Sequence, residues 1–303
     1  MELVRDATLK NRGGWTLPLF LVLLWCQFFF ALAPTWLEIP SYSYAFVAAP
    51  LLTLLMFQAW SEIPVAKATP PSETTSSLLL VGIFLMILPL LVVRPLQQVD
   101  QFWRLPLWMH ALSVFFASSF SLFWAFGWRG SKKLIRLSFF IVLLVPLPSA
   151  LEGLIVGNLT RIVSGGVSGL LPWTGYPIDQ LGNAMLVKGT ILDVSEGCSG
   201  LRSFQAAFMA GVFLGEFYQH SVLRRVLLMV MAIALALLGN GARIYYLTTV
   251  AYNQGPEAEA RVHETAGIIV TTLIFASIGL VAWCLSRESA PAKTRTVRRG
   301  VAS

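Results

Sequence analysis

Long apolar stretches, each of roughly 17 to 25 residues, recur along this 303-residue sequence. A helix of that length crosses the ~30 Å hydrocarbon core of a bilayer and satisfies its own backbone hydrogen bonds where water is absent. Hydrophobic residues make up 56% of the chain and charged residues only 12%, which excludes a soluble domain. The sequence therefore predicts an all-α polytopic membrane protein with about eight transmembrane helices.

The predicted membrane crossings are the apolar stretches between polar breaks. They are Trp15 to Ala33, Ser41 to Trp60, Ser77 to Val93, Leu107 to Phe126, Leu134 to Ile155, Cys198 to Phe217, Val222 to Ile244 and Ala266 to Leu285. Motifs with polar chemistry are concentrated after the fourth crossing. We therefore divide the chain into a four-helix membrane scaffold at 1–133, a membrane core at 134–285 that carries the chemistry, and a basic tail at 286–303.

The placement of basic residues orients these helices in the membrane. With both termini in the cytoplasm, fifteen of the 22 Lys and Arg residues fall in inner loops and tails, as the positive-inside rule requires. The net charge of +7 would suggest nucleic acid binding in a soluble protein, but here the membrane topology accounts for it. We expect a multi-pass membrane protein with both termini cytoplasmic and no nucleic acid partner.

A loop of about forty residues separates the fifth predicted crossing from the sixth. In its first part, 153–171, apolar residues recur at helical intervals, which favours a helix lying at the membrane interface. Two short β-favouring runs, 184–187 and 190–194, flank Lys188 and Gly189, which form a plausible two-residue turn. We therefore expect a small extracytoplasmic region with an interfacial helix and a β-hairpin.

Cys198 follows this hairpin, in the run Glu196-Gly197-Cys198-Ser199-Gly200-Leu201-Arg202, immediately before an apolar helix. Backbone N–H groups and the positive end of the helix dipole stabilise a thiolate at such a place, and Arg202, one turn on, adds positive charge. Because the thiolate is the nucleophilic form, Cys198 is a candidate catalytic residue. Taken alone, it is equally well explained as a cysteine that fills a helix start.

Two further polar residues return to the same side of the membrane. Arg243 lies with Asn240 at the predicted outer end of the seventh helix, and His263 immediately precedes the eighth. An arginine beside hydrocarbon is costly unless it has a counter-charge or a task, although snorkelling is a common alternative. A thiolate nucleophile, a cation for the oxyanion and a histidine for protons together suit acyl transfer. We predict that Cys198, Arg243 and His263 converge on one outward-facing cleft.

Other polar residues have weaker claims. Residues expected to position this trio or the substrate are Glu196, Ser199, Arg202 and Asn240. We expect His110 to be packed near the outer start of the fourth helix, His220 to lie in a solvated basic turn, and Glu152 to pair with a loop cation. The sequence has no Gly-rich phosphate loop and no paired metal-ligand motif, so we expect neither a cofactor nor a metal.

In these motifs the sequence resembles the exosortase and archaeosortase family. The resemblance covers roughly residues 138–285 and implies that Cys198 is the nucleophile, Arg243 the transition-state stabiliser and His263 the general acid or base. One departure is Gly197, where the family pattern has alanine. The features that carry the resemblance are Pro146 and Pro148 in a helix, the Cys-Ser-Gly box at 196–203, the Asn-x-x-Arg sequence at 240–243, and His263 with Gly267.

The resemblance implies a membrane-embedded cysteine transpeptidase or protease of the bacterial inner membrane. Its partners would be exported substrate proteins with a C-terminal Pro-Glu-Pro-like motif, a transmembrane helix and a basic end, cleaved at the outer face through a thioester intermediate. A membrane transporter or a lipid-modifying acyltransferase would use the same outer-face polar cluster differently, and both alternatives stay open. A purely structural subunit would leave these motifs without explanation.

Overall fold

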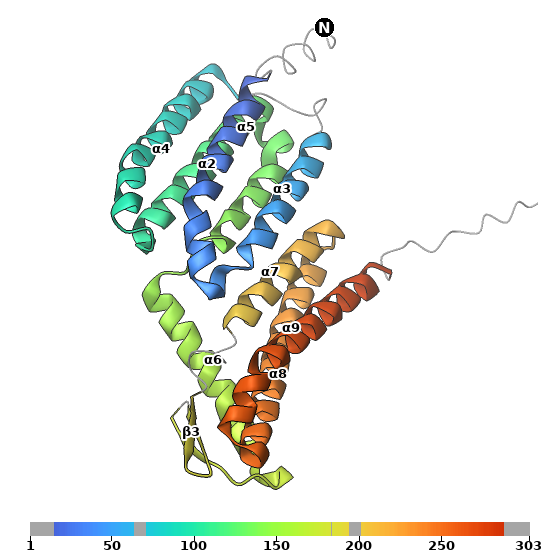
Figure 1. Cartoon of the computed structure of the whole chain (residues 1–303). Helices are drawn as coiled ribbons and strands as arrows, with labels where there is room; N and C mark the ends of the chain where they lie inside the picture. The colour runs from blue at the N-terminus through green and yellow to red at the C-terminus, as the bar shows by residue number, and fades with distance from the viewer. Residues whose placement is uncertain (1–14, 64–70, 183, 194–200, 288–303) are drawn as a thin grey trace, which may run out of the picture.

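The computed structural model describes residues 15–63, 71–182, 184–193 and 201–287 (Figure 1). This part of the chain contains eight α-helices and one small sheet of three strands. Seven of its helical segments are long and apolar enough to cross a membrane, judged by length and composition. The predicted class, an all-α polytopic membrane protein with a small β-hairpin, is confirmed.

The elements follow the predicted order along the chain, with three short 3-10 helices (η) among them. They are α2 (Thr16–Glu38), η1 (Pro40–Tyr42), α3 (Ala45–Ser61), α4 (Glu73–Val99), α5 (Arg104–Ser138), η3 (Phe139–Leu143), α6 (Ser149–Leu170), η4 (Pro172–Thr174), β1 (Asp179–Leu181), β2 (Ala184–Val187), β3 (Thr190–Asp193), α7 (Leu201–Phe217), α8 (Val222–Gln254) and α9 (Pro256–Arg287). The first three helices coincide with the first three predicted crossings. The division of the chain at residue 133, which falls inside α5, stays a prediction.

Two helical arms make up α5. Gly127 joins them with φ 63° and ψ −179°, a backbone conformation that favours glycine, and the chain turns back there (Figure 1). The first arm matches the fourth predicted crossing. The second arm continues through η3 to Leu143, after which Pro146 and Pro148 interrupt the helix before α6. The predicted fifth crossing, 134–155, is therefore wrong at its C-terminal end.

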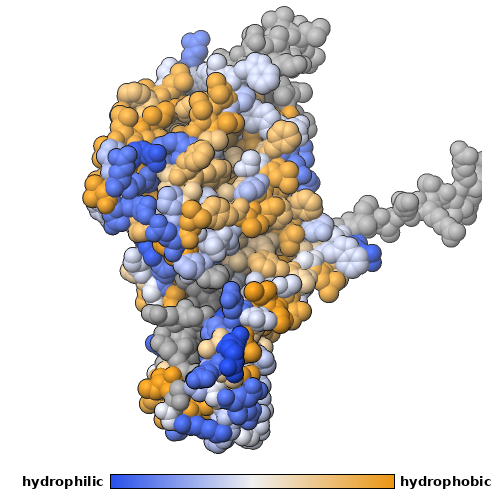
Figure 2. Space-filling model, in the orientation of Figure 1, coloured by the Kyte–Doolittle hydropathy of each residue, from blue (hydrophilic) through white to orange (hydrophobic). Residues whose placement is uncertain are grey.

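The N-terminal bundle consists of α2, α3, α4 and α5, and its core lies around the second arm of α5. Leu134, Leu137 and Ile141 on this arm are at most 2% exposed. Large apolar side chains cover the outside of the bundle as well, as Figure 2 shows by its hydrophobic colouring. A lipid environment favours an apolar exterior over an apolar core, because lipid tails are as apolar as the core side chains and do not solvate polar groups.

The helices α8 and α9 form a long antiparallel hairpin that turns at Gly255, whose φ is 88°. At 1.5 Å per residue their 33 and 32 residues span about 50 Å, more than the ~30 Å of a hydrocarbon core. The distal part of the hairpin extends away from the N-terminal bundle and carries α6 and the sheet (Figure 1), and hydrophilic residues gather at this end (Figure 2).

The predicted β-hairpin is confirmed. Its strands β2 and β3 are antiparallel, and Val187 pairs with Thr190 across a two-residue turn. Lys188 and Gly189 in that turn have φ of 48° and 84°, and two positive φ angles match the twist of a tight hairpin. The sequence analysis missed β1, which pairs with β2 on its other side.

The predicted helix at 153–171 is confirmed as α6, which begins slightly earlier. It packs against α8, where a Cβ atom on Gly241 would lie 3.7 Å from Val163 and 3.8 Å from Val167. The small residue allows the two helices to approach closely, as is common between helices in lipid. How α6 lies relative to the bilayer stays a prediction, since its length and composition also suit a membrane crossing.

Candidate functional site

Arg243 and His263 lie within the α8–α9 hairpin rather than at helix ends. The helix α8 continues for about three turns beyond Arg243, and α9 begins about two turns before His263. The predicted helix ends at Ile244 and Ala266 are therefore wrong. They marked the limits of apolar sequence, whereas both helices continue through more polar sequence where α6 and the sheet accompany them.

The guanidinium of Arg243 packs against Gly267 on α9. A Cβ atom on Gly267 would lie 3.4 Å from both Cζ and Nη2 of Arg243 and 3.6 Å from its Nε. Gly267 follows His263 by four residues, so the two share one face of α9. A small residue at this position thus lets the arginine lie against the helical turn that carries the histidine. Two of the three predicted site residues come to adjoining turns of neighbouring helices, while their chemical roles stay predictions.

Glu259 holds the ring of His263, and the sequence analysis had not singled it out. Its Oε1 lies 2.6 Å from Nδ1 of His263, one helical turn away on α9. The histidine side chain is 34% exposed and the glutamate side chain 15% exposed, so the imidazole reaches solvent while the carboxylate is mostly covered. A carboxylate at Nδ1 fixes the orientation of the ring and its tautomer. The Glu-x-x-x-His spacing in a helix was the signal for this pair.

Polar residues also enter the contact between α6 and α8. Asn240, one turn before Arg243, is 3% exposed, and Thr160 and Ser164 on α6 are 1% and 0% exposed. Ser164 accepts a hydrogen bond of 3.5 Å from the side-chain amide of Gln180 in β1. The turn of α8 that leads to Arg243 is thus covered by protein, and the positioning role of Asn240 stays a prediction.

The cysteine motif falls largely outside the described residues. Glu196, Cys198 and Ser199 belong to the segment 194–200, and their predicted placement and roles stay predictions. Arg202 is the second residue of α7, and its side chain is also outside the described part. The sixth predicted crossing begins within this segment, and its described portion is α7, with 17 residues.

The helix α7 packs directly on the hairpin that carries Arg243 and His263. A Cβ atom on Gly211 of α7 would lie 3.3 Å from the Cβ of Ala232 on α8. Ala207 on α7 and Ile278 on α9 are 0% exposed in the same apolar cluster. The helix that follows the cysteine motif is thus in contact with both helices that provide the other two predicted site residues.

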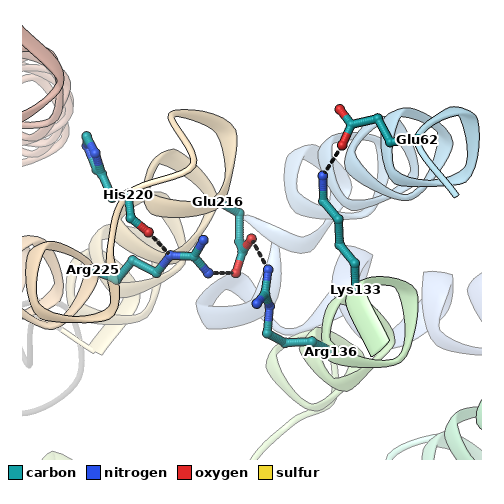
Figure 3. Close-up of polar contacts among 6 residues, drawn as sticks. All are labelled: Glu62, Lys133, Arg136, Glu216, His220 and Arg225. Carbon is teal, nitrogen blue, oxygen red and sulfur yellow. Dashed lines mark hydrogen bonds and ion pairs between the residues drawn. The ribbon is translucent and has the colours of Figure 1, made fainter. Parts of the chain in front are cut away.

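Three ion pairs lie at the opposite end of the hairpin, near the start of α8 (Figure 3). Glu216 on α7 pairs with Arg225 on α8 and with Arg136 on α5, and Lys133 on α5 pairs with Glu62 after α3. These residues come from segments that the sequence analysis assigns to one side of the membrane. They are far apart in the sequence, so this agreement supports the predicted order of crossings.

The other two histidines are buried. His220, expected in a solvated turn, is 4% exposed, and its Nε2 lies 3.2 Å from the carbonyl oxygen of Ala282, so that expectation is wrong. The chain turns tightly at the end of α7, where the His220 N–H bonds the Gly215 carbonyl, and this turn places His220 against α9 instead of in solvent. His110 is packed as expected, with its ring nitrogens 3.0 Å from Gln27 and 3.4 Å from Gln97.

Glu152 has the cationic partner that the sequence analysis expected, although the cation begins a helix instead of lying in a loop. Its carboxylate pairs with Arg104, the first residue of α5. For metals, the described residues contain no group of three or more His, Cys, Asp or Glu side chains that could hold an ion.

The fold and the site define a multi-pass membrane protein with an arginine and a carboxylate-held histidine on adjoining turns of two long helices. A family model described as a transmembrane exosortase matches residues 36–282. The chain belongs to this transmembrane exosortase family. No curated protein and no solved structure matches the chain. The family match extends well beyond the 138–285 region of the sequence motifs and includes most of the N-terminal bundle. Membership implies a membrane enzyme of the transpeptidase or protease class that processes sorting signals.

Proposed function

We propose that this protein is a membrane-embedded cysteine transpeptidase or protease that cleaves C-terminal sorting signals of exported proteins. The observation that carries this proposal is the packing of the Arg243 guanidinium against Gly267, on the face of α9 where Glu259 holds His263. A fixed cation beside an oriented imidazole provides two of the three groups that thiol acyl transfer needs. Cys198, whose motif precedes the adjacent helix α7, would provide the third.

In the proposed reaction, the Cys198 thiolate attacks the carbonyl carbon of the scissile peptide bond and forms a tetrahedral oxyanion. Arg243 stabilises this oxyanion, an effect worth about 10² to 10³ in rate for one such donor. Nε2 of the protonated His263 donates its proton to the leaving amine nitrogen, the C–N bond breaks, and a thioester remains. An amine or water then attacks the thioester, His263 accepts its proton, and the thiolate leaves.

The dimensions of the hairpin support a reaction at the membrane surface. From Val222 to Arg243, α8 rises about 32 Å, and from Arg287 back to His263, α9 rises about 36 Å. Both distances approximate the ~30 Å thickness of a hydrocarbon core. If Val222 and Arg287 lie at the cytoplasmic boundary, Arg243 and His263 lie at the outer boundary, and α6 and the sheet lie beyond it.

This geometry also suits the proposed partners. Exosortases act on proteins with a C-terminal sorting signal, which we take to be a Pro-Glu-Pro-like motif, a transmembrane helix and a basic cytoplasmic end. A substrate helix anchored by its basic end would present the residues just outside the bilayer at the level of Arg243 and His263. We propose the inner membrane as the location, with both termini cytoplasmic and the reaction on the outer side.

The first experiment follows processing of a reporter with a C-terminal sorting signal in membranes, for wild type and for Cys198→Ala at equal protein levels. Cys284→Ala is the matched control, because Cys284 is an exposed cysteine on α9. We expect Cys198→Ala to abolish processing and Cys284→Ala to preserve it. Processing by Cys198→Ala at the wild-type rate would remove thiol catalysis and favour a transporter.

The second experiment tests the orientation of His263 with the same reporter. Glu259→Gln should slow processing by about tenfold or more, because general acid–base catalysis by an oriented histidine contributes about 10² to 10⁴. Glu264→Gln is the control, since Glu264 is an exposed acid on the same helix. Equal rates for wild type and Glu259→Gln would show that the carboxylate does not orient the catalytic ring.

A further inference from the structure

A short segment, residues 143–148, leads from the last residue of η3 to α6, and we name it the α5–α6 connector. Side chains of the N-terminal bundle hydrogen-bond its backbone groups, which have no helical partners of their own. These bonds are Tyr44 Oη to the Leu143 carbonyl at 2.6 Å, Trp36 Nε1 to the Leu144 carbonyl at 2.9 Å, Trp108 Nε1 to the Pro146 carbonyl at 2.8 Å, Arg104 to the Leu147 carbonyl, and the Leu147 N–H to Tyr42 Oη at 2.9 Å.

Tyr42 is the central residue of this arrangement. Its side chain is 0% exposed, its hydroxyl accepts the Leu147 N–H, and it donates to Glu152 Oε1 at 3.2 Å. The other carboxylate oxygen of Glu152 pairs with Arg104, which also donates to the Leu147 carbonyl. Tyr42, Arg104 and Glu152 thus enclose Leu147 and fix the first turn of α6. Such a buried polar network favours one arrangement because each member depends on the others.

The same residue lies against the helix that follows the cysteine motif. The 3-10 helix η1, which ends at Tyr42, packs on α7, and Gln205 in the second turn of α7 adjoins the Tyr42 side chain and is 8% exposed. Tyr42 therefore lies where the N-terminal bundle, α6 and α7 meet. Since α6 packs on α8 beside Gly241, the network connects the start of α7 with the part of the hairpin that holds Arg243.

We propose that Tyr42, Arg104 and Glu152 are positioning residues that set the orientation of α7, and with it Cys198, relative to Arg243 and His263. The inference rests on the proposed function, and it gives the N-terminal bundle a part in catalysis without contact with substrate. Misplacement of a reacting group by about 1 Å can cost a hundredfold in rate. A network that sets the position of α7 can therefore change the reaction rate without contact with the substrate.

The test compares Tyr42→Phe with Tyr44→Phe. Each variant keeps its ring and loses one hydroxyl that bonds the connector, but only the Tyr42 hydroxyl also bonds Glu152, and only Tyr42 adjoins Gln205 on α7. In solubilised protein we expect Tyr42→Phe to lower kcat for reporter cleavage by about tenfold with KM changed less than about twofold. Tyr44→Phe should stay within about twofold of wild type in both constants. A purely structural role would lower the yield of folded protein and leave kcat of the remainder unchanged.

A second measurement does not depend on the reaction. In a chain with Cys26→Ser and Cys284→Ser, the rate at which a membrane-impermeant maleimide alkylates Cys198 reports its surroundings. We expect Tyr42→Phe to change this alkylation rate at least about twofold and Tyr44→Phe to leave it unchanged. If Tyr42→Phe does not accumulate in the membrane, Gln205→Leu replaces it. Unchanged kcat and unchanged alkylation would overturn the inference. If Tyr42→Phe changes the alkylation rate but Cys198→Ala still processes the reporter, the proposed function is refuted. The inferred effect of Tyr42 on the surroundings of Cys198 is not.

Discussion

Glu216 allows a stability prediction with a matched control in the same region (Figure 3). Its side chain is 5% exposed, and its carboxylate pairs with Arg225 on one oxygen and with Arg136, at 3.0 Å, on the other. Three helices, α5, α7 and α8, thus meet at one negative charge. The substitution Glu216→Gln keeps the shape of the side chain and removes that charge, which leaves two arginines without their shared counter-ion.

Breaking a buried ion pair by removing one partner costs about 3 to 5 kcal/mol. The Arg136 side chain is 51% exposed and that of Arg225 22% exposed, so Arg136 can regain water after the change. We therefore expect Glu216→Gln to lower the free energy of unfolding by about 3 kcal/mol, the lower end of this range. Glu62→Gln is the control: its partner Lys133 and Glu62 itself are 36% and 51% exposed, and an exposed pair contributes at most about 1 kcal/mol.

The assay is unfolding in mixed micelles titrated with sodium dodecyl sulfate and followed by tryptophan fluorescence. Added salt should reduce the small effect of Glu62→Gln further and change that of Glu216→Gln little, because salt screens exposed charges more than buried ones. Equal losses for the two variants, both below about 1 kcal/mol, would refute the argument. That result would mean that the two arginines reach solvent easily and that Glu216 does not join the three helices.

Two glycines of the hairpin give further predictions. Gly267→Ala should retain processing, because a Cβ atom 3.4 Å from the Arg243 guanidinium is an ordinary contact. Gly267→Leu should displace the guanidinium and slow the reporter reaction by about 10² to 10³. Equal rates for the two variants would contradict this packing. Gly239→Ala should destabilise the protein by about 1 to 3 kcal/mol, because its Cβ would lie 2.7 Å from Cδ1 of Ile274. Ile274→Ala in the same chain should recover part of this loss in the detergent titration. Gly279→Ala, with no atom within 4 Å, is the control and should not destabilise.

The sequence by itself determined the features that depend on local physical chemistry. The length of each apolar run must match the thickness of the hydrocarbon core, so the membrane class and most crossings could be predicted. The turn at Lys188 and Gly189 could be predicted because two residues suffice to define its backbone. The motifs around Cys198, Arg243 and His263 identified the family for the same reason, since each motif is a short continuous run. The proposed role of Cys198 likewise rests on that run.

The tertiary structure alone decided which residues from distant parts of the chain meet. Tyr42 and Glu152 are 110 residues apart, and nothing in the sequence pairs them. The contact of Arg243 with Gly267 likewise depends on the way α8 and α9 pack. Hydropathy measures transfer into lipid, and lipid is as apolar as the side chains between helices, so it does not select helix neighbours. Neighbours are chosen instead by close packing at small residues and by buried hydrogen bonds, and these depend on the whole fold.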